Sequence, residues 1–222
     1  MNEIKIDKLI RSRRRSISLS ISNDATLVVR APLRTPLSFI ENIVFNKIDW
    51  INKARTKAQE NKKTIKQKTY CEDEEFLFLG EIYKLKIGNF ETVHLTDCLC
   101  LPEKYSNNAR TFIINWYKQE AMKKITERVK LYNEITGWKH KKLNIKSAKT
   151  RWGSCGPTDI ISLNWKLIMA PLTVMDYVVV HELAHLVERN HSKRFWHKVQ
   201  RYIPNYKLRR RWLRENNKML SL

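Results

Sequence analysis

The chain has 222 residues, of which 42% are hydrophobic and 10% aromatic, so it can bury a sizeable core and differs from disordered or fibrous chains. It has no apolar stretch long enough to span a bilayer and no secretory signal at its start, so we expect no membrane association. Its four cysteines form no disulfide framework, which favours a soluble protein of the reducing cytoplasm.

The charge of the chain is strongly and unevenly basic. Lys and Arg number 43 against 22 Asp and Glu, a net charge of +21. Residues 71–105 are acidic overall, whereas segments 1–70, 106–150 and 181–222 carry the basic excess. A field of this sign attracts polyanions and is compatible with a DNA or RNA partner. A solvated basic coat without any partner explains the same charge equally well.

The first half of the chain is predicted to be rich in strands. Over residues 2–31, apolar residues alternate with serines, as in a hairpin. After Pro36 the apolar spacing changes to threes and fours, which predicts one helix leading into a polar linker at residues 62–68. Short strands are expected again over residues 75–102. We therefore expect residues 1–105 to form a β-rich accessory region with one helix.

The second half, residues 106–222, is predicted to be a separate domain. A long helix is expected over residues 107–135, with Gly137 ending it. Strands are expected near residues 143–147, 151–155 and 160–165, and helices near residues 173–187, 192–202 and 205–216. The turn Gly156–Asp159 between the last two strands is typical of a hairpin. The fold class expected is α+β, with a small antiparallel sheet in this domain.

The most informative residues are His181, Glu182 and His185, which form a His-Glu-x-x-His motif. Two histidines four residues apart stand on one face of a helix, so both imidazoles can bind one metal ion. The glutamate between them can act as a general base on a water molecule at that metal. The predicted helix that contains the motif is otherwise apolar, and burying unpaired polar side chains in it would cost free energy. The residues therefore predict a catalytic zinc site, with one zinc per chain.

A catalytic zinc commonly has three protein ligands, so a third ligand is expected. His191 follows a predicted helix end, where Asn190 would let the chain turn back toward the motif. His197, in the middle of the next helix, and Glu215, farther along the chain, are the alternatives. His191 is the preferred candidate because a turn would hold it at a fixed corner.

The last third of the chain resembles the YgjP-like predicted metal-dependent hydrolases, a group similar to the SprT-like zinc metalloproteases. The matching pieces are Arg151-Trp152-Gly153-Ser154-Cys155, Leu163-Asn164-Trp165-Lys166-Leu167, Tyr177-Val178-Val179-Val180 with the His181–His185 motif, Asn190-His191-Ser192 with Phe195-Trp196, and Arg209-Arg210-Arg211-Trp212-Leu213. The resemblance implies a zincin-like fold, zinc bound by three histidines (His181, His185 and His191), and Glu182 as the general base.

The predicted function is a zinc metallopeptidase that acts on proteins or peptides. The hairpin just before the motif helix would supply a sheet edge for an extended substrate. The cleft candidates are Arg151, Trp152, Asn164 and Trp165. A zinc-dependent nuclease is less well supplied, because a two-metal site needs more carboxylates than this region has.

A rival prediction is a basic nucleic-acid-binding protein with a structural or vestigial zinc site. The nucleic-acid candidates are Arg11, Arg13, Arg14, Arg15, Lys141, Lys142, Arg209, Arg210 and Arg211. Against this rival, a structural site needs no acid at Glu182, and three ligands leave a coordination position open.

Overall fold

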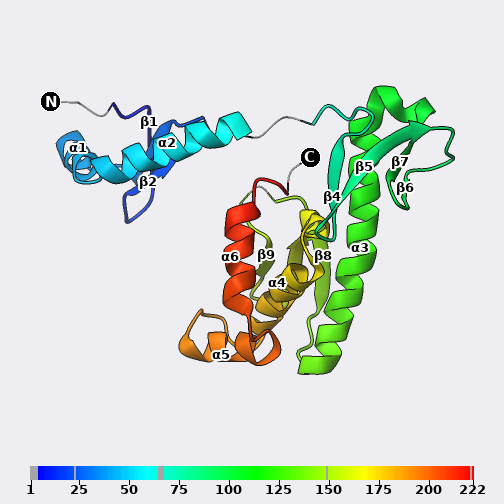
Figure 1. Cartoon of the computed structure of the whole chain (residues 1–222). Helices are drawn as coiled ribbons and strands as arrows, with labels where there is room; N and C mark the ends of the chain where they lie inside the picture. Colours follow the sequence, from blue (N-terminus) through cyan, green and yellow to red (C-terminus); the bar gives the residue numbers. More distant parts are fainter. Residues whose placement is uncertain (1–4, 23, 65–67, 149, 221) are drawn as a thin grey trace. The chain divides into compact units, whose positions relative to one another are not determined.

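The computed structural model describes residues 5–222 except positions 23, 65–67, 149 and 221. It divides into two compact units, Met1–Lys66 and Gln67–Leu222 (Figure 1). The linker expected at residues 62–68 falls partly outside the described residues. None of the described helices is long and apolar enough to cross a membrane.

The first unit combines a small sheet with two helices. Its strands are β1 (Lys8–Ser12), β2 (Ser18–Ile21) and β3 (Leu27–Pro32), and its helices are α1 (Leu37–Phe45) and α2 (Ile48–Thr64). The central strand β3 pairs in parallel with β1 and antiparallel with β2. Its inward side chains form a core with Ile40, Val44 and Ile51 from the helices.

The one helix expected in this region is two helices. The break begins at Asn46, and asparagine has a low helix propensity because its side chain can compete for backbone hydrogen bonds.

The boundary between the two units lies earlier than the expected division at residue 105. Strands β4 (Glu75–Phe78), β5 (Glu81–Gly88), β6 (His94–Leu95) and β7 (Leu99–Pro102) form a sheet in the order β4-β5-β7-β6. Their buried residues Phe76, Leu85 and Leu101 belong to the same core as the helices that follow. Shared burial of apolar surface therefore joins this sheet to the second unit.

The long helix α3 (Ala109–Thr136) follows the short 3-10 turn η1 (Glu103–Asn108) and ends at Gly137, which adopts a left-handed conformation (φ 73°). It packs against the 3-10 turn η2 (Trp165–Met169) and helix α4 (Leu172–Ala184). Arg128 on α3 donates two hydrogen bonds to Asp176 on α4, at 2.6 and 2.9 Å. This largely buried bidentate ion pair fixes α4 against α3.

The second sheet of this unit is mixed, whereas the sequence predicted an antiparallel one. Its strands β8 (Lys142–Lys146), β9 (Gly153–Cys155) and β10 (Ile160–Asn164) lie in the order β8-β10-β9. The hairpin β9–β10 is antiparallel as expected, but β8 pairs in parallel with the other edge of β10. The difference arises because β10 lies between β8 and β9 in the sheet. β9 runs antiparallel to its neighbour β10, and β8 pairs with the other edge of β10 in the parallel direction. Helices α5 (Lys193–Tyr202) and α6 (Tyr206–Asn216) complete the unit beside α4 (Figure 1).

Candidate metal centre

Helix α4 carries the first half of the site on its last turn. Val178, Val179 and Val180 are buried, so the helix is held inside the unit by apolar contacts on several sides. His181 and Glu182 follow within the helix, and His185 stands at its C-terminal cap. The two histidines therefore lie one helical turn apart, as the sequence predicted.

A turn after α4 brings His191 back to the helix. The backbone N–H of Glu188 donates to Ala184 O at 3.0 Å, which closes the turn. Ser192 caps α5 by accepting from the N–H of Phe195 at 3.2 Å, and this cap fixes the residue before it. The Nε2 atoms of His191 and His181 are 3.0 Å apart. One ligand atom from each of the three histidines lies within 4.8 Å of the others, and this group could hold a metal ion.

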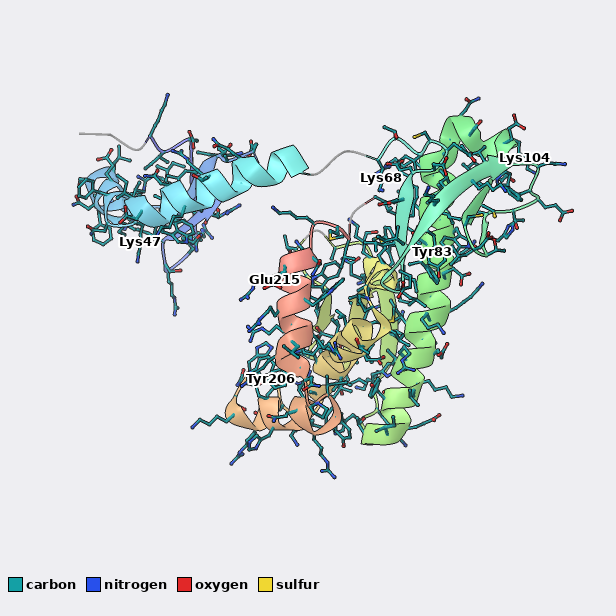
Figure 2. All side chains as sticks on the ribbon, in the orientation of Figure 1. Lys47, Lys68, Tyr83, Lys104, Tyr206 and Glu215 are labelled. Carbon is teal, nitrogen blue, oxygen red and sulfur yellow. The ribbon has the colours of Figure 1, made fainter. Side chains whose placement is uncertain are left out.

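The two other ligand candidates lie outside this group. His197 is exposed on α5. Glu215 lies near the C-terminal end of α6, at the other end of the helix from Tyr206 (Figure 2). The ring of Tyr206 stacks on Trp196, which in turn stacks on His191. Among the described residues, neither His197 nor Glu215 belongs to a cluster of three metal-ligating groups.

The electrostatics around His181 and His185 suit metal binding. Burial, together with the neighbouring histidines and Arg210, lowers the pKa of His181 to about 3, and burial also lowers the pKa of His185. Both rings are therefore held neutral, which is the form that binds a metal. His185 Nδ1 lies 3.2 Å from Glu188 O; if it donates there, Nε2 is left free to ligate.

The spacing of the nitrogens also fits zinc. Two nitrogens bound to a tetrahedral zinc lie about 3.3 Å apart, as follows from Zn–N bonds of about 2.0–2.1 Å. The 3.0 Å between His181 and His191 is close to that separation. At this distance one neutral Nε2 can donate a hydrogen bond to the other, or both can turn their lone pairs to one shared cation.

Aromatic rings support the three histidines. Phe195 is fully buried, with its ring centroid 4.5–4.9 Å from the centroids of all three imidazoles. Trp196 stacks on His191, with ring centroids 5.6 Å apart and planes 24° apart. The sequence marked both residues only as part of a family pattern. Their position in the first turn of α5, four and five residues after His191, is the signal that could have placed them at the site.

The carboxylate of Glu182 sits in a tight, buried place against β9. Its exposed fraction is only 5%, and burial raises its pKa to about 8, an effect that the charge of Arg151 opposes. A Cβ atom at Gly153 would lie 2.5 Å from both Cγ and Oε1 of Glu182. In the sequence Gly153 stands out only as part of the family pattern, although a glycine inside a strand often marks a close approach of this kind.

Arg189 ties the turn between the histidines to the β9–β10 hairpin. Its guanidinium donates to Gly156 O at 2.8 Å and forms an ion pair with Asp159. It also contacts Cys155 Sγ at 3.5 Å. The segment that carries His191 is therefore linked to the strand that contacts Glu182. No motif pointed to Arg189, because its partners are distant in sequence.

The four cleft candidates differ in their placement. Asn164 and Trp165 are each only 4% exposed and have internal partners: Asn164 donates to Ala148 O at 2.9 Å, and Trp165 Nε1 donates to Ser147 Oγ at 2.8 Å. They contribute to packing in place of the expected cleft wall. Trp152 is half-buried against the core, and Arg151 is exposed.

The nucleic-acid candidates do not form one established surface, because they are divided between the two units. Arg11 donates to the carbonyls of Pro32, Leu33 and Thr35, and therefore holds the end of β3. Arg14 donates to Ser18. Five of the remaining candidates are exposed: Arg13, Arg15, Lys141, Lys142 and Arg211. Arg209 is half-buried, and Arg210 lies over the ring of Trp196.

The second unit thus has an α+β fold in which three imidazoles could hold one metal ion. The model of the YgjP-like family, metallopeptidase domain, matches residues 15–216. The chain belongs to this family, and the match includes most of the first unit as well as the second. Membership supports a metal-dependent peptidase and implies a divalent metal.

Other comparisons add little. No curated protein matches the chain. One solved structure, a crystal structure of the metallopeptidase zymogen of Pyrococcus abyssi abylysin, is 22% identical, covering 41% of this chain and 93% of that one with a TM-score of 0.38.

Proposed function

We propose that the protein is a zinc-dependent peptidase of the His-Glu-x-x-His type. The observation that carries this proposal is the convergence of His181, His185 and His191 beside the buried carboxylate of Glu182. Zinc held by the three histidines would polarise a carbonyl group and ease the ionisation of a water molecule. With three protein ligands, one position stays open for that chemistry.

Glu182 is the general base in this proposal. It accepts a proton from the attacking water and returns it to the leaving amine. Burial raises its pKa to about 8, so its carboxylate is a stronger base than an exposed one. A cation bound nearby favours the ionised carboxylate and brings it into its reactive form. The close contact at Gly153 limits where the carboxylate can move.

The proposed substrate is a protein or peptide in an extended conformation. Strand β9 is paired with β10 on one side and is the last strand of its sheet among the described residues. It also contacts α4, the helix that carries Glu182. An extended chain added to its outer edge would make backbone hydrogen bonds close to the metal centre.

The test is hydrolysis of denatured casein by the full chain loaded with zinc. We expect cleavage that requires the metal and is abolished in Glu182→Gln. Chelator-resistant cleavage, or equal cleavage by the variant, would contradict the proposal.

The nucleic-acid-binding alternative predicts a different result. The exposed basic residues Lys207, Arg211 and Arg214 on α6 are the observation that favours it. In that case oligonucleotides would bind with an affinity that falls steeply with salt, and zinc-loaded protein would not cleave casein.

A further inference from the structure

The acidic side chains around the candidate metal centre already have partners. Within residues 151–222 the acids are Asp159, Asp176, Glu182, Glu188 and Glu215. Asp159 pairs with Arg189, Asp176 with Arg128, and Glu215 with Arg214. Glu188 accepts a hydrogen bond from Ser192, and Glu182 is buried. Among the described residues, none of these acids forms an ion pair with Arg151 or Arg210.

Arg210 is one of these cations. It is exposed on α6, and its Cζ atom lies 5.3 Å from the ring centroid of Trp196, the ring that stacks on His191. Its positive charge helps to lower the pKa of His181. At Tyr177 the same charge acts to lower the pKa, but burial has the larger effect and raises it. Among the described residues it has no ion pair. Its guanidinium therefore flanks the histidine side of the centre.

Arg151 is the second cation, and it lies two residues before Gly153, the glycine that contacts Glu182. It is exposed just before β9, and its charge acts on Glu182. Its backbone is held in place, because Asn164 donates to Arg151 O at 3.3 Å. No described residue forms an ion pair with its side chain. A peptide lying along β9 would pass this guanidinium as it approaches the metal centre.

We propose that Arg151 and Arg210 make this site selective for peptides with acidic side chains close to the bond that is cut. The proposal rests on the proposed peptidase function and names its substrate class. Guanidinium groups bind carboxylates through paired hydrogen bonds, and a guanidinium without an ion pair gives up no carboxylate partner when it does so. Acidic peptides are favoured over nucleic acid because Arg210 lies over the ring that stacks on His191 and Arg151 adjoins the sheet edge at β9, where a peptide backbone fits.

The first experiment measures binding separately from catalysis. Two labelled peptides are used, one of alternating leucine and glutamate and the other its glutamine counterpart, with zinc-loaded Glu182→Gln protein. We expect the glutamate peptide to bind about tenfold more tightly, as a charged hydrogen bond predicts. The difference should shrink in high salt, because exposed charges are screened. Equal binding of the two peptides would overturn the proposal.

Variants locate the effect. In the Glu182→Gln background, Arg151→Gln and Arg210→Gln should each reduce the preference for glutamate, and the double variant should abolish it. Arg211→Gln is the matched control, because Arg211 is an exposed neighbouring charge on the same helix, whereas the contact with the Trp196 ring is made by Arg210. An equal loss with the control would assign the preference to general charge and overturn the specific role of the two arginines.

The second experiment uses the active protein. Cleavage sites in denatured casein are mapped by mass spectrometry, and one site is remade as a peptide with its acids replaced by amides. We expect kcat/KM to fall about tenfold, mostly through KM, in the wild type but not in the double variant. Casein cleavage without acidic residues at the sites overturns the selectivity alone. Absence of any Glu182-dependent cleavage overturns the proposed function, while the binding result still decides the preference.

Discussion

Gly153 and Glu182 are in direct contact: a Cβ atom at position 153 would lie 2.5 Å from the carboxylate oxygen Oε1 of Glu182. No real Cβ contact is this short, so a larger residue at 153 must displace the glutamate side chain or the strand.

The first prediction concerns this contact. We expect Gly153→Ala to lower the rate of peptide hydrolysis about 100-fold, because even a small displacement of a catalytic group is costly. The three histidines are untouched, so zinc content should stay near one per chain. Gly156→Ala is the control, since the nearest atom to its Cβ would be Ile160 O at an ordinary 3.6 Å. Full activity in Gly153→Ala would show that the position of the Glu182 carboxylate does not depend on the absence of a side chain at residue 153.

The second prediction separates the base from the metal ligands. Glu182→Gln keeps the size and burial of the side chain but removes its basicity. We expect metal analysis to show unchanged zinc and peptide assays to show a loss of at least about 1,000-fold in kcat, within the range for a lost general base. Loss of zinc from this variant would instead make Glu182 a ligand.

The third prediction identifies the third ligand. His191→Ala should weaken zinc binding by more than about 100-fold, because one of three ligands is lost. His197→Ala should change it by less than about threefold, since His197 is exposed and outside the histidine group. Zinc content after dialysis against a competing chelator measures both. Equal retention by the two variants would rule out His191.

The fourth prediction is a pH dependence of the metal-free protein. Folding raises the pKa of Glu182 from its ordinary 4.5 to about 8, so the folded state binds this proton more tightly and stability falls as pH rises between those values. Folding lowers the pKa of His181 from 6.5 to about 3, so stability falls as pH drops between those values. Between pH 4.5 and 6.5 the two effects oppose each other.

Urea denaturation of chelator-treated protein tests this expectation. The contribution of these two groups to the free energy of unfolding should be constant near pH 5–6. It should fall toward lower pH (the acidic arm) and toward higher pH (the alkaline arm), by at most about 1.4 kcal/mol per pH unit for each proton. Glu182→Gln should lose the alkaline arm and keep the acidic one. An alkaline arm of unchanged slope in the variant would show that another group causes it.

The sequence by itself determined the local parts of the site. His181 and His185 share a helix face because the helical repeat brings residues four apart together, and their positions needed no other part of the chain. The fold class, the long helix before Gly137 and the hairpin turn at Gly156–Asp159 were also predictable, since each depends on neighbours in sequence.

Only the tertiary structure decided which distant residues meet. The contact of Gly153 with Glu182, the bond network of Arg189 and the ion pair of Arg128 with Asp176 each join separate elements. The same holds for the parallel pairing of β8 with β10 and for the division of the chain at Lys66. Periodicity describes which face of an element is apolar, but it does not say which other element covers that face. That choice is made by the packing of the whole unit, where burial of the shared core outweighs local preference.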